Sequence, residues 1–218
     1  MKIRGKLVRM TVAAAAVVLA GAGMAVSAEA QEIDINPPEQ VYIAPVLGYD
    51  NVIGSSMGDS ISKGGLTYGG MAGIDTPVGK HGRVGLEASV AGSTAALTLA
   101  GSDGINTAEV KIAAGVDLYI GGKLGWMVAP KTQLFATLGY ANSKFTASAR
   151  FNGTKIWQES TSLSGFRVGA GAEYFLTPHV RARLEYRYTH YGEISYQDQP
   201  LGGKAERHQV LGGLLYGF

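Results

Sequence analysis

The chain has 218 residues, no cysteine and 32 glycines, with 46% hydrophobic residues, 17% charged residues and a net charge of +2. The absence of cysteine excludes disulfide frameworks, cysteine-ligated metals and cysteine nucleophiles. The high hydrophobic fraction and the small net charge argue against intrinsic disorder.

The first thirty residues have the three-part layout of a secretory signal peptide. Four basic residues precede an apolar run at 11–26, and Ala28-Glu29-Ala30 supplies the small residues that a signal peptidase reads. We expect removal of residues 1–30, with cleavage after Ala28 as the alternative. An uncleaved membrane anchor fits less well, because the apolar run is short for a span of about 20 residues.

Removal of this segment changes the charge of the chain. It takes away four of the 19 basic residues and one of the 17 acidic residues, which leaves 15 against 16 and a net charge of −1. Nucleic-acid binding needs a basic face, so it loses its main support. The sequence therefore predicts an exported protein that does not bind nucleic acid.

Residues 31–39 form a predicted polar tether, and residues 40–218 form the predicted domain. Tyr, Val, Leu, Thr and Gly dominate this domain, and helical periodicity is hardly present. No stretch in it approaches the roughly 18 consecutive apolar residues of a transmembrane helix. The pattern predicts eight strands, at approximately 40–50, 66–76, 83–92, 109–128, 133–150, 154–175, 180–191 and 206–218.

The predicted connections differ in length on the two sides of the strands. The short connections contain proline, and the long ones are rich in Gly, Ser and Asp. The fifth and sixth strands meet at Asn152-Gly153, a typical sequence of a type I′ hairpin. An even strand number with one rim of short turns and one rim of long loops is typical of a membrane β-barrel. The short connections are 76–82, 129–132 and 176–179, and the long ones are 51–65, 93–108 and 192–205.

Alternation with period two separates two faces of the predicted sheet. One face holds 37 positions without a single charge, and its aromatic residues fall into two bands. Such bands are typical of the two lipid–water boundaries of a membrane barrel. The band near the loops comprises Tyr49, Tyr68, Tyr140, Phe166 and Tyr188, and the band near the turns comprises Trp126, Tyr174, Tyr216 and Phe218.

The opposite face combines charged residues with eleven glycines. Long charged side chains inside a narrow barrel need small neighbours, whereas glycines on a solvated face would only weaken the strands. We therefore expect the apolar face to contact lipid and the charged face to line the lumen, the reverse of a soluble barrel. The predicted lumen network comprises Glu87, Asp117, Lys123, Arg167, Glu173, Arg183, Glu185 and Arg187, with Asp75 near the turn rim.

These lumen charges are expected to pair, because unpaired charges in a confined space are costly. The favoured interpretation is a salt-bridged plug that fixes strand register and blocks flow, since side chains can fill an eight-stranded interior. The alternative is a small gated ion path in which the pairs exchange partners. A large diffusion pore does not fit this geometry.

The last predicted strand alternates apolar residues up to a terminal aromatic residue. We expect it to close the barrel against the first strand, because a free strand edge is not tolerated in lipid. Pro45 lies inside that first strand and predicts a local bulge or a missing ladder bond.

Three segments resemble the outer-membrane β-barrel family, which includes opacity-type surface antigens, porin-family domains and the eight-stranded barrel of outer-membrane protein A. They are 166–177 (FRVGAGAEYFLT), 181–192 (RARLEYRYTHYG) and 210–218 (VLGGLLYGF). The resemblance covers about residues 40–218 and implies an eight-stranded antiparallel up-and-down barrel in the outer membrane of a Gram-negative-type bacterium. It also implies an assembly signal, similar to the one read by the barrel-assembly machinery, at Val210, Leu214, Tyr216 and Phe218.

Some small outer-membrane barrels modify lipid A, but an enzymatic role finds little support in this chain. His190 and His208, near the loop rim on neighbouring strands, are the only plausible catalytic or metal-binding pair. No histidine shows the His-x-Ser pattern of lipid A deacylases, and no third metal ligand is evident. We therefore expect no enzyme activity, no cofactor and no metal.

The long loops are candidate contact regions, since loops on a rigid barrel commonly carry function. Lys144, Arg150, Lys155 and Trp157 could touch lipopolysaccharide phosphates or an extracellular ligand, and a solvated rim is the alternative. The expected function is a structural, antigenic or adhesive surface protein. The alternative is a narrow-channel porin-family protein that passes ions or very small solutes. Expected partners are outer-membrane lipid, lipopolysaccharide and the barrel-assembly machinery.

Overall fold

The computed structural model describes residues 37–56, 59–102, 106–191, 195–196, 199–200 and 204–218. The predicted signal peptide and most of the predicted tether lie outside the described residues. Among the described residues, no helix has the length and apolar character needed to cross a bilayer.

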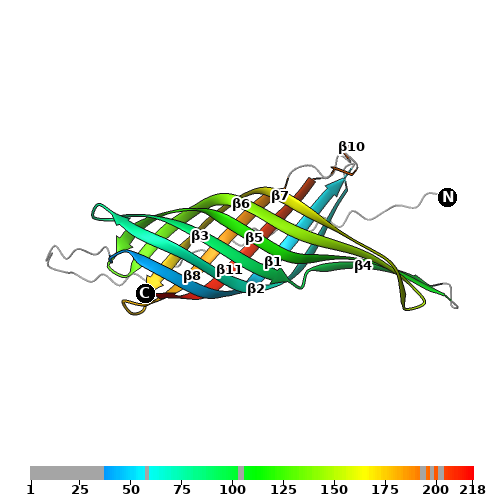
Figure 1. The fold of residues 1–218 in the computed structure, drawn as a ribbon, viewed down its shortest axis with the longest axis horizontal. Coiled ribbons are helices and arrows are strands. Elements are labelled where there is room, and N and C mark those ends of the chain that lie inside the picture. The colour runs from blue at the N-terminus through cyan, green and yellow to red at the C-terminus, as the bar shows by residue number, and fades with distance from the viewer. Residues whose placement is uncertain (1–36, 57–58, 103–105, 192–194, 197–198, 201–203) are drawn as a thin grey trace, which may run out of the picture. The chain divides into compact units, whose positions relative to one another are not determined.

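Nearly all described residues lie in antiparallel strands, and eight of these strands close into a barrel. Each strand pairs with the next, β3 pairs with β5, and β11 pairs with β1 to complete the ring. Figure 1 shows these strands tilted and side by side. The predicted eight-stranded antiparallel barrel is confirmed. Its strands are β1 (Gln40–Ser56), β2 (Asp59–Val78), β3 (Gly82–Ser93), β5 (Thr107–Ala129), β6 (Thr132–Phe151), β7 (Thr154–Phe175), β8 (Val180–Tyr191) and β11 (Lys204–Gly217).

The first and last strands meet at a seam that shows the predicted effect of proline. Ala44 and Pro45 are skipped in the pairing of β1 with β11, while the register on both sides of the gap is the same. Because proline has no N–H group, the ladder bond is missing there, and no bulge forms. At the end of the seam, the backbone N–H of Phe218 donates to the carbonyl of Val41 at 2.9 Å.

Two of the connections predicted as long loops consist largely of strand, so this prediction is wrong. Within 51–65, β1 continues to Ser56 and β2 begins at Asp59. Within 93–108, β4 (Ala96–Ser102) pairs with β5. These segments are rich in small and polar residues, so their strand character depends on pairing with neighbouring strands. In the third long connection, β9 (Ser195–Tyr196) and β10 (Gln199–Pro200) pair with each other.

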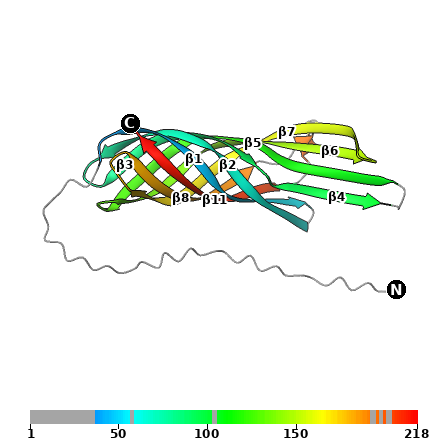
Figure 2. The ribbon, with the colours of Figure 1, turned by 90° about the horizontal axis from the view of Figure 1, so that it is seen from below.

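On the loop side, β4 and the adjoining halves of β5, β6 and β7 form a four-stranded sheet, the extension (96–102, 107–116, 143–151 and 154–164). Figure 2 shows these strands reaching beyond the other strands of the barrel. β4 follows β3 along the same edge of β5, which pairs first with β3 and then with β4. Asn152 and Gly153, at the tip between β6 and β7, have φ of 49° and 77°. Positive φ at both positions is the property of the predicted type I′ turn.

Burial alternates with period two along the barrel strands. On β6, Gln133, Phe135 and Thr137 are buried, while Leu134 and Leu138 are 44% and 64% exposed. Large apolar side chains lie exposed on the outward face around the barrel, including both predicted aromatic bands. So large an apolar exterior does not fit water and is typical of a barrel immersed in lipid. The predicted inversion of the two faces is confirmed.

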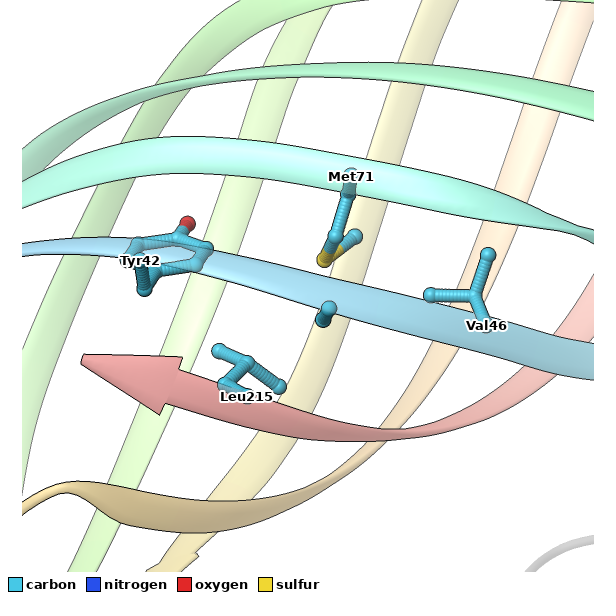
Figure 3. Close-up of a cluster of buried hydrophobic side chains, with 5 residues drawn as sticks. Tyr42, Val46, Met71 and Leu215 are labelled. Carbon is cyan, nitrogen blue, oxygen red and sulfur yellow. The ribbon is translucent and has the colours of Figure 1, made fainter.

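The lumen is not uniformly polar, because an apolar cluster lies beside the seam. Tyr42, Ala44 and Val46 of β1 pack there with Met71 of β2 and Leu215 of β11, and all five are buried. Figure 3 shows these side chains gathered around β1. This cluster supports the closure of the barrel through apolar burial, next to the charged network described below.

Candidate functional site

The charged side chains of the lumen form the candidate functional site. Thirteen charged residues among the described residues are buried, each no more than 5% exposed. All eight predicted members of the network are among them. They are Asp50, Asp75, Arg83, Glu87, Asp117, Lys123, Arg167, Glu173, Arg181, Arg183, Glu185, Arg187 and Arg207.

Asp75, which was predicted near the turn rim and not counted among the eight network residues, takes part in a turn-side cluster of lumen charges. Its carboxylate is 3.1 Å from Lys123 Nζ and 2.9 Å from an Arg181 nitrogen. Arg83 Nε lies 3.3 Å from the other carboxylate oxygen. Asp75 thus joins β2 to β3, β5 and β8 across the lumen.

Glu173 of β7 belongs to the same cluster. Lys123 Nζ lies 2.7 Å from one oxygen of Glu173, and Arg181 lies 2.8 Å from the other. Arg183 contacts the first of these oxygens at 3.2 Å. Two carboxylates and four cations (Arg83, Lys123, Arg181 and Arg183) therefore share one buried site, and their attraction offsets part of the cost of burying them.

Arg183 links this group to a second pair of carboxylates. Its guanidinium lies 2.9 Å from Glu87 and 2.9 Å from Glu185. Arg187 lies 2.9 Å from Glu185 and 3.6 Å from Glu87. The Arg183 guanidinium also stacks over the Phe135 ring at 4.2 Å from its centroid, a cation–π contact.

A second cluster lies on the loop side of the lumen. Arg167 is 2.8 Å from Asp117, and Arg207 is 3.4 Å from the same carboxylate. Arg207 also forms an ion pair with Asp50 of β1, so the cluster bridges the seam. The Nε of Arg167 donates to the Thr189 hydroxyl at 2.7 Å.

Tyr119 separates the two clusters. The guanidinium carbons of Arg167 and Arg187 both lie 5.4 Å from the centroid of its ring. A Cβ added to Gly121 would lie 2.2 Å from the Tyr119 hydroxyl, and one added to Gly139 would lie 2.8 Å from the ring. These two glycines therefore make room for the ring, which accounts for glycine on the charged face.

Asp50, Arg83, Arg181 and Arg207 belong to the network, but the sequence analysis did not assign them to it. Each is the first, second or last residue of a predicted strand and has the inward parity of that strand. Applying the alternation to the ends of the predicted strands would have found them.

The predicted contact residues lie on the extension. Lys144 and Arg150 are on β6, and Lys155 and Trp157 are on β7. Arg150 lies 3.8 Å from Glu109 in an exposed pair. The ammonium of Lys155 donates to Gln158 at 2.6 Å, also on the exposed surface. The indole of Trp157 is 47% exposed.

The polarity of the two faces is exchanged on the extension. The face that continues the lumen is apolar there, since Leu99 lies opposite Val110 and Trp157 lies opposite Ala149. The face that continues the lipid-facing surface is polar and carries most of the charges. Its charged residues are Glu109, Lys111, Lys144, Arg150 and Lys155. The outward surface therefore changes from apolar to basic along single strands.

His190 and His208 lie on the outward face of β8 and β11, among aromatic side chains. His190 Nδ1 is 3.8 Å from Glu206, and His208 Nδ1 is 2.6 Å from the Tyr186 hydroxyl. In the part of the chain that the structure describes, no three His, Asp or Glu side chains are grouped to hold a metal ion.

Comparisons with known proteins agree with this architecture. Residues 13–218 match the family described as outer membrane protein beta-barrel domain. The chain is 26% identical over 168 residues to the 31 kDa outer-membrane immunogenic protein of Brucella melitensis, covering 72% of this chain and 68% of that protein. It is 32% identical over 94 residues to a 22 kDa outer membrane protein of Rhizobium leguminosarum, covering 43% of this chain and 42% of that protein.

Similar solved structures include Neisserial surface protein A. That structure has a TM-score of 0.48 and 16% sequence identity to this chain, and the match covers 82% of this chain and 97% of that one.

Proposed function

Because this chain belongs to the outer-membrane β-barrel family, we propose that it is a structural and antigenic surface protein with a closed lumen. The protein is located in the outer membrane. The observation that carries the proposal is the burial of thirteen lumen charges in ion pairs, several of which cross the lumen from β8 to β2 and β3. Such a network fixes strand register and leaves no room for a wide aqueous path.

The extension faces the outside of the cell in this proposal, and the short turns face the periplasm. A rigid barrel presents its longer connections for contact. The extension exposes basic side chains on one face and apolar ones on the other, which suits adhesion or recognition by antibodies. The name of the Brucella relative, an immunogenic outer-membrane protein, is consistent with this role.

A planar-bilayer recording tests the plug. We expect the refolded barrel to insert without steady conductance, because the ion pairs around Arg183 and Asp75 fill the turn-side half of the lumen. A large-conductance porin serves as the positive control for insertion and recording. Steady openings of porin size would overturn the plug.

A second candidate function is a narrow ion path, and one observation favours it. Among the residues that the structure describes, several buried polar atoms of the lumen have no hydrogen-bond partner, including both amide atoms of Gln133 and the carbonyl oxygen of Gln209. Buried groups of this kind are usually satisfied by water. Brief, small openings that change with ionic strength in the same recording would support the ion path over the plug.

The proposal includes no catalytic step. His190 and His208 face outward, where His190 lies near Glu206 and His208 is hydrogen-bonded to the Tyr186 hydroxyl. Deletion of the gene is expected to leave the mass spectrum of lipid A unchanged. If deletion removes or alters a lipid A species and the gene on a plasmid restores that species, the protein acts as an enzyme on lipid A.

The terminal strand is proposed to carry the assembly signal, with Phe218 as its last residue. Phe218 is 68% exposed on the lipid side, and its ring contacts Tyr216 edge-on at 5.1 Å. Phe218→Ser is expected to lower the amount of assembled barrel in cells severalfold while refolding in detergent stays near normal.

The matched control for this variant is Tyr174→Ser, which removes an aromatic residue of the same band from β7. Heat-dependent gel mobility of membrane extracts measures assembly of both variants. Equal losses for the two variants, in cells and in detergent alike, would contradict a signal role for Phe218.

A further inference from the structure

A groove of about 870 Å³ lies along the wall formed by β1, β2, β3, β5 and β6. One row of its lining consists of directly opposed residues on these five strands: Ile43, Ala72, Ala88, Ile120 and Tyr140. All five face outward, into the region that lipid occupies. Ten of the fifteen lining residues face outward, so the groove is a hollow in the lipid-facing surface, while Ala44, Gly69, Met71, Ser89 and Tyr119 belong to the inward face of the same wall.

Small residues produce the hollow. Ala72 and Ala88 form the middle of that row, and Gly70 lies at the middle of the adjacent row. Val90, Leu118 and Ile120, which are half or more exposed, rise beside them. An apolar channel between such ridges is filled in a bilayer by a flexible hydrocarbon chain, because an unfilled hollow forfeits dispersion contacts.

One end of the groove reaches the membrane surface. Tyr140 belongs to the loop-side aromatic band, and Asn142 lines the groove two residues further along β6. Lys144 follows on the same strand and the same face, and its side chain is exposed. Two residues of strand span about 7 Å, so the Lys144 backbone lies within a headgroup's reach of the groove mouth.

The surface above this mouth is basic. The outward face of the extension holds Lys111, Lys144, Arg150 and Lys155, against the single acidic side chain of Glu109. Glu109 is already paired with Arg150. This face is therefore suited to several phosphate groups at increasing height above the bilayer.

We propose that the groove and this basic face together bind one lipopolysaccharide molecule of the outer leaflet. An acyl chain lies along Gly70, Ala72 and Ala88, and a lipid A phosphate meets Lys144. The remaining bases contact phosphates of the inner core. A phospholipid has one phosphate, at the height of Tyr140 and Asn142, and it cannot reach the bases further out. The inference rests on the proposed function only in placing the extension outside the cell.

Filling the groove tests the apolar half of the site. In the full chain refolded into phosphatidylglycerol-containing vesicles, Ala72→Leu/Ala88→Leu is expected to weaken binding of purified lipopolysaccharide by about tenfold, since the added side chains occupy the space of the acyl chain. The matched control is Ala136→Leu/Ala170→Leu, a second pair of directly opposed, lipid-facing alanines outside the groove. The control is expected to bind like the unmodified chain.

The charged half is tested with Lys144→Gln, with Lys131→Gln on the turn side as its control. Lys144→Gln and dephosphorylated lipopolysaccharide are both expected to weaken binding severalfold, and the two losses should not add. Heparin is included as a sulfated polysaccharide probe. Heparin bound as tightly as lipopolysaccharide would overturn the proposal in favour of an extracellular polysaccharide.

Three further outcomes would also overturn it. In the first, lipopolysaccharide binding falls equally in Ala72→Leu/Ala88→Leu and in Ala136→Leu/Ala170→Leu. In the second, Ala72→Leu/Ala88→Leu binds lipopolysaccharide as well as the unmodified chain. In the third, excess phosphatidylglycerol displaces lipopolysaccharide. Heat-dependent mobility and bilayer conductance are recorded on the same samples. A folded, closed barrel that fails to bind lipopolysaccharide removes this inference and leaves the proposed surface role intact.

Discussion

Replacing Arg183 by methionine is expected to lower the free energy of unfolding by about 3–5 kcal/mol, the usual cost of removing one partner from a buried ion pair. Methionine keeps most of the side-chain volume against Phe135 but removes the charge. Glu87 and Glu185 then lose contacts of 2.9 Å, and Glu173 loses one of 3.2 Å. Urea titration of the refolded barrel, followed by heat-dependent gel mobility, measures the change.

Arg150→Met is the control for this substitution. Arg150 makes a 3.8 Å pair with Glu109, and its side chain is 51% exposed. Its loss is expected to cost less than about 1 kcal/mol, as for other exposed ion pairs. Similar costs for the two single variants would contradict a stabilising role for the lumen network.

Arginine at Ala170 is expected to destabilise the barrel in a bilayer by about 2–4 kcal/mol, as for a cation at the midplane of a lipid-facing strand. Ala170 points outward on β7, four residues from Phe166 in one aromatic band and four from Tyr174 in the other. It therefore lies midway between the two bands. Urea unfolding of the variant in phospholipid vesicles gives the difference from the unmodified chain.

Ser164→Arg provides the depth control on the same strand and the same face. Ser164 lies two residues beyond Phe166, on the side of the extension. Near the interface the cost is expected to fall to about 0–1 kcal/mol. If Ala170→Arg is tolerated as well as Ser164→Arg, the outward face of β7 is not in lipid.

The residues that face the lumen could be predicted from the sequence, because the alternation of inward and outward side chains is a local property of each strand. Arg183, Glu185 and Arg187 alternate with Ala182, Leu184 and Tyr186, and the structure places the first set inside and the second set outside. The sequence of such a strand is therefore enough to assign both of its faces.

The choice of partners within the lumen was not accessible in the same way. Asp75 pairs with Arg181, which is 106 positions away in the chain. Such contacts depend on the tilt of the strands and on their stagger around the barrel, and no single strand contains that information. The same limit explains why Asp75 was not counted among the eight predicted network residues.

Within the extension, only β4 was not predicted, and for a different reason. Above the barrel rim both faces of β4 are accessible to solvent, so no lipid enforces an apolar outward face. Thr98 and Leu99 therefore do not follow the alternation of inward polar and outward apolar residues seen in the barrel strands. β4 is identified as a strand by its regular antiparallel pairing with β5.

Closure of the barrel by β1 and β11 constrains the order of events in its folding. The ring is incomplete until β11 pairs with β1, so the barrel cannot close before β11 has been synthesised. Pairing between such distant segments is intrinsically slow. Until the ring closes, outward apolar side chains that are still in water would promote aggregation. Slow closure and aggregation therefore compete during the assembly of this fold.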